Sequence, residues 1–386
     1  MAVKKLWKGK FMEESLQRSV TITYNDYMND STILTNILDE YGFIVVTDIL
    51  SKEECNQAET LVNDDLIKLI DFEKLDKFDD KLLKFANDVK SGKIKYPQDS
   101  IPGLSNRGFM STHGLPQGEY AWKMRTNARV KKIYETLYKT NDLVVSVDVP
   151  FYKVRKGQDN GSDLWAHADH NDKYEKGSNV CYQGILYAWD STTPDRSTTV
   201  VLPKSYNNEY KKLIKLVNIE QEKEGKINHF VNIFTLPKSS IQEELIENFK
   251  ENARRVQVPA GGLIIFNSKT IHQGYSAGKR LAQPICWEPR FERDQCALRR
   301  KLECCHQGIA TTHWASIGIK HGASRVIFRK KPRFKSDGKD GGDTNDNIFP
   351  ISKFKSFSLK NPLNTKHNVS LDILKSNIKD EYLKYM

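Results

Sequence analysis

The sequence predicts a mainly β protein with flanking helices, an α+β class arranged as a sandwich or barrel. Two observations support this fold class. Short apolar runs recur after residue 140, and Gly, Pro, Asn or Asp bounds each of them, which is typical of sandwiches and barrels. The segments before those runs have the apolar spacing and capping residues of helices. The expected strands are 144–154, 181–188, 198–202, 256–266 and 282–287.

Helices are expected at 32–38, after Ser51 and at 129–138. Ser51 is a good N-cap residue, and Glu54 follows it at the spacing of a capping box. The run 41–46 is rich in β-branched residues and predicts a short strand.

Three parts are expected along the 386 residues. Residues 1–30 predict a charged leader with little specified structure. Residues 31–330 predict one enzyme-sized domain, in which a charged helical insert at about 207–253 interrupts the strands. Residues 331–386 predict a basic tail that begins with a flexible linker, because 335–343 contain no apolar side chain.

The composition limits the class of protein and of partner. Hydrophobic residues make up 38% of the chain, which excludes a generally disordered protein. The formal net charge of +11 arises from 60 basic and 49 acidic residues and is weak evidence for nucleic acid. No apolar run is long enough to span a bilayer, and the first residues lack the apolar core of a signal peptide. We therefore expect a cytoplasmic protein, with the nucleus also open. The six cysteines are expected to be reduced thiols.

The segment 164–172 concentrates imidazole and carboxylate groups. In a strand, residues i and i+2 point to the same side, so His167 and Asp169 can aim at one point. A histidine from another strand would complete a 2-His-1-carboxylate triad, which leaves positions on iron for O2 and an organic cosubstrate. His272 lies just past the end of an apolar run and is the expected third ligand.

Arg280 follows His272 by eight residues and heads the next apolar run. A buried guanidinium there is suited to bind a dicarboxylate through two parallel hydrogen bonds. Each of these residues alone has a plainer interpretation, such as a loop histidine or a solvated arginine. Their order and their strand contexts together favour the site.

A second HxD motif overlaps the first, because His170 and Asp172 have the same spacing. Only one of the two registers can face the metal ion. The pair of His167 and Asp169 is favoured, since the residues at 164–165 are typical of a strand and those after 170 are typical of a loop.

These residues resemble the phytanoyl-CoA dioxygenase (PhyH) family of Fe(II)/2-oxoglutarate oxygenases, in particular its viral and fungal type. The resemblance covers about 41–314. The similar runs are 42–46, 50–55, 121–125, 142–148, 165–169, 183–184, 200–206, 262–272 and 311–314. It implies a double-stranded β-helix core of the jelly-roll or cupin-like kind. It also implies iron ligands at His167, Asp169 and His272, with 2-oxoglutarate bound by Arg280. Further candidates for contact with the cosubstrate are Gln183, Lys123 and Arg125, for which packing or surface roles are equal alternatives.

The chain departs from the family pattern at three places. Lys204 and Tyr206 replace the usual Gly and His of a "PGSH" run, and no Asp follows Gly261 and Gly262. These positions are not iron ligands, so the expected metal site is unaffected. We expect structural roles for His313 and Trp314 near the end of the resemblance.

The function implied by the resemblance is a dioxygenase that hydroxylates an unidentified small molecule. It would use Fe(II), O2 and 2-oxoglutarate, release succinate and CO2, and take ascorbate as a candidate reductant. Two alternatives stay open at this point. One is a catalytically silent binding protein of the same fold, and the other is an oxygenase associated with nucleic acid, prompted by the basic tail.

Overall fold

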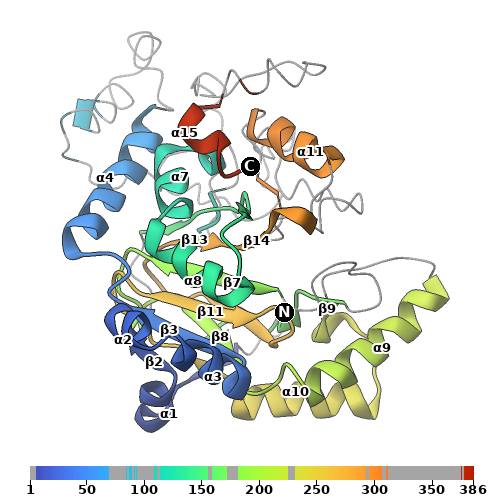
Figure 1. The fold of residues 1–386 in the computed structure, drawn as a ribbon. Helices are drawn as coiled ribbons and strands as arrows, with labels where there is room; N and C mark the ends of the chain where they lie inside the picture. The colour runs from blue at the N-terminus through green and yellow to red at the C-terminus, as the bar shows by residue number, and fades with distance from the viewer. Residues whose placement is uncertain are drawn as a thin grey trace, which may run out of the picture. The chain divides into compact units, whose positions relative to one another are not determined.

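The chain forms two compact units, each assembled from segments that lie far apart in the sequence. Unit 1 comprises Met1–Lys52, Lys132–Asn141 and Arg155–Arg280, and unit 2 comprises Glu53–Lys131, Asp142–Val154 and Leu281–Met386. Figure 1 shows the ribbon of this computed structural model, with helices and strands in both units. The structure describes residues 6–68, 84, 87–88, 91, 93, 108–110, 114–154, 159–171, 181–224, 231–292, 295–306, 310–311, 375 and 378–386.

The first sheet of unit 1 contains six strands in the order β1-β10-β8-β12-β6-β9. Strand β12 pairs antiparallel with β8 on one side and with β6 on the other. The pairing places His272 directly opposite His167. The bounds are β1 Lys10–Phe11, β6 His167–Ala168, β8 Thr198–Val201, β9 Val231–Asn232, β10 Arg254–Arg255 and β12 His272–Tyr275.

Four neighbouring strands of the second sheet belong to unit 1, in the order β2-β3-β11-β7. These strands are β2 Thr21–Thr23, β3 Phe43–Thr47, β7 Tyr182–Tyr187 and β11 Leu263–Asn267. The two sheets face each other, because the Tyr187 hydroxyl on β7 hydrogen-bonds the Thr199 hydroxyl on β8 at 3.0 Å. The chain changes sheet at each step from β6 to β7 to β8, and again from β10 to β11 to β12.

The expected strands at 41–46, 181–188 and 198–202 are confirmed as β3, β7 and β8. The run 256–266 forms a strand only at its end, because the turn at 259–262 precedes β11. That turn requires a glycine: Gly261 has φ 81°, and its amide donates to the Tyr187 carbonyl at 2.8 Å.

Residues 10–29 differ from the expected leader without specified structure. They form β1, α1 (Glu14–Ser19), β2 and α2 (Tyr24–Asn29). Strand β2 runs parallel to β3, and α2 begins with a capping box between Thr23 and Asp26. The expectation was wrong here because strands of two or three residues are too short to show a periodic pattern.

The expected helices are confirmed as α3 (Thr32–Tyr41), α4 (Lys52–Lys68) and α8 (Ala128–Tyr138). The insert at 207–253 is also helical. It contains α9 (Asn208–Glu224), η3 (Ile233–Thr235) and α10 (Ser240–Asn252), and Figure 1 shows α9 and α10 side by side. Their apolar faces pack in one cluster with Ile271 and Tyr275, next to and on β12.

Unit 2 holds the run 144–154 as two strands, β4 (Leu143–Val145) and β5 (Phe151–Lys153), where one was expected. The run 282–287 also divides, into β13 (Arg280–Ile285) and β14 (Trp287–Pro289), and β14 pairs antiparallel with β4. The remaining elements are η2 (Leu115–Gln117), α7 (Glu119–Arg125), η4 (Arg290–Glu292), α11 (Gln295–His306) and α15 (Asp380–Leu383).

The linker expected at 335–343 lies outside the described residues, whereas the end of the tail forms α15. Tyr382 of α15 stacks on Trp122 of α7, with ring centroids 4.8 Å apart. Across the described part of the chain, none of the helices has both the length and the apolar composition to cross a bilayer.

The turn before β11 gives a test of the fold. A Cβ at Gly261 would lie 2.3 Å from the Leu50 carbonyl oxygen, in addition to the strain of its positive φ. Gly261→Ala should therefore lower the free energy of unfolding by about 2 kcal/mol or more, measured by urea denaturation. Gly262 is adjacent and has no positive φ, so Gly262→Ala should lower the free energy of unfolding by less. A loss for Gly261→Ala no larger than for Gly262→Ala would contradict this account.

Candidate metal centre

Three side chains of unit 1 meet where β6 and β12 pair. His167 and His272 occupy opposite positions on the two strands, and their ring centroids lie 4.3 Å apart. The Asp169 carboxylate spans the two Nε2 atoms: His167 Nε2 is 3.6 Å from Oδ1, and His272 Nε2 is 3.3 Å from Oδ2. The three ligand atoms lie within 4.8 Å of one another, close enough to hold one metal ion.

The backbone fixes the tautomer of both histidines. Nδ1 of His167 contacts the Trp165 carbonyl at 3.1 Å, and Nδ1 of His272 contacts the Thr270 carbonyl at 2.9 Å. A carbonyl oxygen can only accept, so both Nδ1 atoms carry the proton and both Nε2 atoms keep a lone pair. This arrangement, in which the outer nitrogen is hydrogen-bonded, is typical of histidines that bind metal ions.

Burial favours the neutral imidazole that His167 needs in order to bind a metal ion. All three side chains are buried. Desolvation lowers the pKa of His167 below its usual value, although the nearby Asp169 carboxylate opposes the shift. The imidazole is therefore neutral at pH 7 and available to a metal ion. Two imidazole nitrogens and one carboxylate fit non-haem Fe(II), which this donor set binds while other coordination positions stay open.

Neighbouring loops hold the ligands in place. The Asp169 amide donates to the Ser268 carbonyl at 3.1 Å. The amide of Ile271, next to His272, donates to Ser205 Oγ at 2.8 Å. Ser205 follows Lys204, which has a positive φ of 63°. The loop thus makes a left-handed turn at Lys204 and supports the start of β12 through Ser205.

The competing HxD motif has a different environment. Nδ1 of His170 contacts Ser268 Oγ at 3.1 Å, and Tyr210 donates its hydroxyl to the His170 carbonyl at 3.3 Å. His170 is buried, but it is not one of the three residues whose ligand atoms lie together at Asp169. Asp172 lies outside the described residues. The geometry therefore favours the register of His167 and Asp169.

Two side chains of the second sheet reach the triad. Gln183 on β7 donates from Nε2 to Asp169 Oδ2 at 3.3 Å. Phe266 on β11 packs against His272, with ring centroids 4.5 Å apart. Gln183 and Phe266 are opposite each other in the β7–β11 register. No sequence pattern singled out Phe266, because a buried apolar strand residue looks the same in any core.

Trp165 is a third neighbour that the sequence did not single out as a site residue. Its ring stacks on His167, with centroids 4.8 Å apart and planes 16° from parallel. Its amide donates to Gln273 Oε1 at 3.0 Å, which ties it to β12. An aromatic residue two positions before a metal-ligating histidine in a strand would be the signal to look for, since both side chains point to one side.

The Arg280 side chain lies near Gly274 of β12. It donates from Nη2 to the Tyr187 hydroxyl at 2.7 Å, and its guanidinium lies 5.0 Å from the centroid of that ring. A Cβ built at Gly274 would be 4.0 Å from Arg280 Nη1 and 3.3 Å from the Trp165 ring. Gly274 therefore leaves open the space between these two side chains.

Lys123 and Arg125 are on α7 in unit 2. The Lys123 side chain is exposed. Arg125 is fully buried and donates to the carbonyls of Pro116, at 2.7 Å, and of Asp148. Burial lowers the pKa of Arg125 to about 10. These contacts give Arg125 a packing role in unit 2, and cosubstrate contact by either residue stays a prediction. His313 and Trp314 lie outside the described residues.

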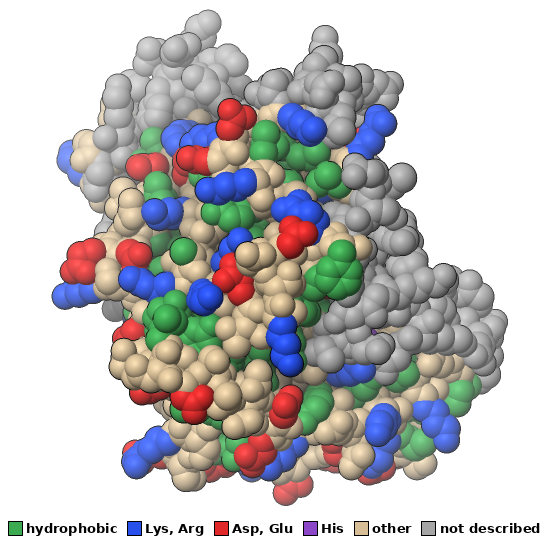
Figure 2. Space-filling view, in the orientation of Figure 1, with side chains coloured by type: hydrophobic (Ala, Val, Ile, Leu, Met, Phe, Trp, Pro, Cys, Tyr) green, Lys and Arg blue, Asp and Glu red, His purple; other side chains and the backbone are tan. Residues whose placement is uncertain are grey.

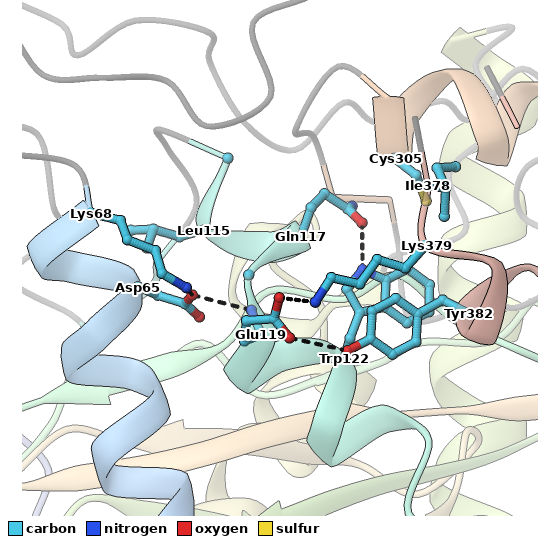
Figure 3. A pocket seen from close by; sticks show the side chains of 12 residues that line it. Asp65, Lys68, Leu115, Gln117, Glu119, Trp122, Cys305, Ile378, Lys379 and Tyr382 are labelled. Atoms are coloured by element: carbon cyan, nitrogen blue, oxygen red, sulfur yellow. Dashed lines mark hydrogen bonds and ion pairs between the residues drawn. The ribbon is translucent and has the colours of Figure 1, made fainter. Parts of the chain in front are cut away.

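Unit 2 also contains a cavity of about 210 Å³ beside α7 and α15 (Figure 3). Its polar side chains pair with one another. Glu119 accepts from Lys379 and, at 3.4 Å, from the Tyr382 hydroxyl, and Asp65 accepts from two amides at the start of α7. These contacts join α15 to α7, so the cavity has a structural explanation.

The charge of the described surface is mixed. Figure 2 shows Lys and Arg side chains interspersed with Asp and Glu over the visible face. Several of them form exposed ion pairs, such as Lys204 with Glu40 at 3.3 Å and Lys212 with Glu244 at 2.6 Å. The basic excess of the sequence therefore does not form a continuous patch on this face.

Comparisons with known proteins give weak likenesses. No protein-family model matches the chain. "Ava biosynthesis cluster protein O" of Aspergillus versicolor is 22% identical over 228 residues, which are 56% of this chain and 71% of that protein. This identity does not place the chain in a family, so membership of the PhyH family stays a resemblance.

Among solved structures, apo HygX from Streptomyces hygroscopicus is 12% identical, with a TM-score of 0.35, over 86% of this chain and 97% of that one. HygX with nickel and 2-oxoglutarate bound has a TM-score of 0.38 at 12% identity, over 82% and 97% of the two chains. The epimerase SnoN in complex with Fe3+, alpha ketoglutarate and nogalamycin RO has a TM-score of 0.35 at 12% identity, over 67% and 84%. Function must therefore be inferred from the site itself.

Removing one imidazole at a time tests the register. His167→Ala should abolish stoichiometric binding of Co(II), a spectroscopic substitute for Fe(II), because it deletes one of three ligands. His170→Ala should leave the Co(II) dissociation constant within about threefold of the wild-type value, since its contacts are with Ser268 and Tyr210. Isothermal titration calorimetry measures both. Loss of binding in His170→Ala with retention in His167→Ala would move the site to the second motif.

Proposed function

We propose that this chain is an Fe(II)/2-oxoglutarate-dependent dioxygenase that hydroxylates a small organic molecule. The observation that carries the proposal is the triad of His167, Asp169 and His272, with both Nε2 lone pairs directed toward one carboxylate. Bound Fe(II) would supply the redox chemistry that couples decarboxylation of 2-oxoglutarate by O2, giving succinate and CO2, to oxidation of a substrate C–H bond.

We further propose that unit 1 is a double-stranded β-helix. The alternation of successive strands between two facing sheets supports this, as does the position of the triad at the end of paired strands β6 and β12. In such a core the second sheet covers the ligands, and here Gln183 and Phe266 of that sheet contact Asp169 and His272.

The proposed cosubstrate follows from the spacing between the triad and Arg280. Gly274 is two residues after His272, so the two positions lie on one face of β12, about 7 Å apart. Arg280 Nη1 lies 4.0 Å from a Cβ built at Gly274. In 2-oxoglutarate, four C–C bonds of about 1.5 Å separate the two carboxyl carbons, a reach of about 5 Å. A five-carbon dicarboxylate is thus long enough to bind the triad's metal ion and Arg280 together.

The side chains around this space would position the cosubstrate and exclude water. Arg280 is oriented by the Tyr187 hydroxyl, which is in turn hydrogen-bonded to Thr199. Trp165 covers the His167 ring, and Phe266 covers His272. A charged ligand between such walls is held by stronger electrostatic interactions than it would have in water.

Turnover of 2-oxoglutarate tests the proposal directly. With Fe(II), ascorbate and O2, the wild-type protein should release succinate and CO2 from 2-oxoglutarate. Asp169→Ala should lower that rate by at least about 100-fold, because it removes a ligand. A folded wild-type protein that binds 2-oxoglutarate but releases no succinate would instead be a binding protein of the same architecture.

The role of Arg280 has its own test. Arg280→Gln should raise the KM for 2-oxoglutarate about 10- to 150-fold, which corresponds to the loss of a charged hydrogen bond worth about 1.5–3 kcal/mol. Arg290→Gln is a matched control, because Arg290 makes a surface ion pair with Asp142. Equal KM values for wild type and Arg280→Gln would exclude Arg280 as the cosubstrate anchor.

A further inference from the structure

Gln183 contacts the carboxylate that joins the two histidines. Its Nε2 donates to Asp169 Oδ2 at 3.3 Å, and the same oxygen is 3.3 Å from His272 Nε2. Gln183 is 5% exposed, so this hydrogen bond lies in a region of low dielectric. In such a region, leaving a polar group without a hydrogen-bond partner lowers stability, and a hydrogen bond that does form is stronger than in water.

The second sheet sets the position of Gln183. It lies on β7 opposite Phe266 on β11, and the Phe266 ring packs against His272. This cross-strand pair of the second sheet therefore contacts two of the three candidate ligands, Asp169 and His272. Directly opposite residues on antiparallel strands are close neighbours, so the two contacts are mechanically linked.

We propose that Gln183 is a positioning residue that fixes the Asp169 carboxylate so that it binds a metal ion through one oxygen. The inference rests on the proposed function, since it requires a metal ion at the triad. The amide holds Oδ2, which leaves Oδ1, the oxygen that faces His167, for the metal ion. A carboxylate bound through one oxygen fills one coordination position. The triad then fills three positions and leaves three of an octahedral site for a chelating keto acid and O2.

A carboxamide is suited to this task. It donates a hydrogen bond without charge, so it orients the carboxylate without neutralising it as a lysine or arginine would. The role differs from the cosubstrate contact that the resemblance suggested for Gln183. The two roles predict different effects on the affinity for metal and for 2-oxoglutarate.

The test compares Gln183→Leu with the wild-type protein, using Co(II) as the metal probe in the absence of 2-oxoglutarate. Loss of the amide should weaken Co(II) binding about 10- to 100-fold, the usual effect of removing an outer partner of a metal ligand. It should also change the visible absorption of the bound Co(II). At saturating Co(II), the dissociation constant for 2-oxoglutarate should change less than about threefold.

Gln183→Glu provides a second variant of nearly the same size. The new carboxylate would face the metal ion and add a ligand, so Co(II) should stay bound with an altered spectrum. Binding of 2-oxoglutarate should weaken at least about tenfold, because a coordination position is lost.

Gln242→Leu is the matched control. Gln242 is also 5% exposed and donates to the carbonyls of Ile233 at 3.0 Å and Leu236 at 2.8 Å. Its substitution should lower the free energy of unfolding by about 1–3 kcal/mol and leave the Co(II) dissociation constant unchanged.

Wild-type affinity for Co(II) and an unchanged spectrum in Gln183→Leu would overturn the positioning role. If 2-oxoglutarate alone then binds at least tenfold more weakly, Gln183 is a cosubstrate contact instead. If the proposed function itself is wrong, the wild-type protein would bind no Co(II), a result distinct from either outcome for Gln183→Leu.

Discussion

The in-register pairing of His167 with His272 is the constraint on which the candidate site depends. Successive residues of a strand point to opposite faces, so a slip of one residue would turn His272 away from Asp169. The carbonyls of Trp165 and Thr270 then fix each imidazole with Nε2 directed inward. Backbone pairing and backbone hydrogen bonds, rather than flexible side chains, therefore determine where the three donor atoms meet.

The rest of unit 1 maintains that register. Strand β8 pairs with the other edge of β12. Ser205, in the loop after β8, accepts a hydrogen bond from the amide of Ile271, the residue before His272. The helices of the insert pack on Ile271 and Tyr275, beside and within β12. From the second sheet, Gln183 and Phe266 contact the triad. Changes in β8 or in the insert helices would therefore act on the candidate site through β12, whereas changes at Gln183 or Phe266 would act on it directly.

Local patterns in the sequence were enough to predict part of this arrangement. The i, i+2 spacing of His167 and Asp169 predicted a shared direction, and the apolar run before His272 predicted another strand. His272 itself lies on the next strand, β12, and the pairing of β12 with β6 is a long-range property, so neither the contact of Gln183 with Asp169 nor the stacking of Trp165 could be derived. Strands β1 and β2 were missed because two or three residues show no period, and Arg125 gave no sign that it would be buried among backbone carbonyls.

The most direct test of the account is the visible spectrum of the protein with Fe(II) and 2-oxoglutarate under anaerobic conditions. A keto acid that chelates Fe(II) at the triad gives a metal-to-ligand charge-transfer band, which requires metal, cosubstrate and open coordination positions together. The wild-type protein should show the band, and Asp169→Ala and His272→Ala should not. A folded wild-type protein without the band, or variants that keep it, would contradict the assignment of this site.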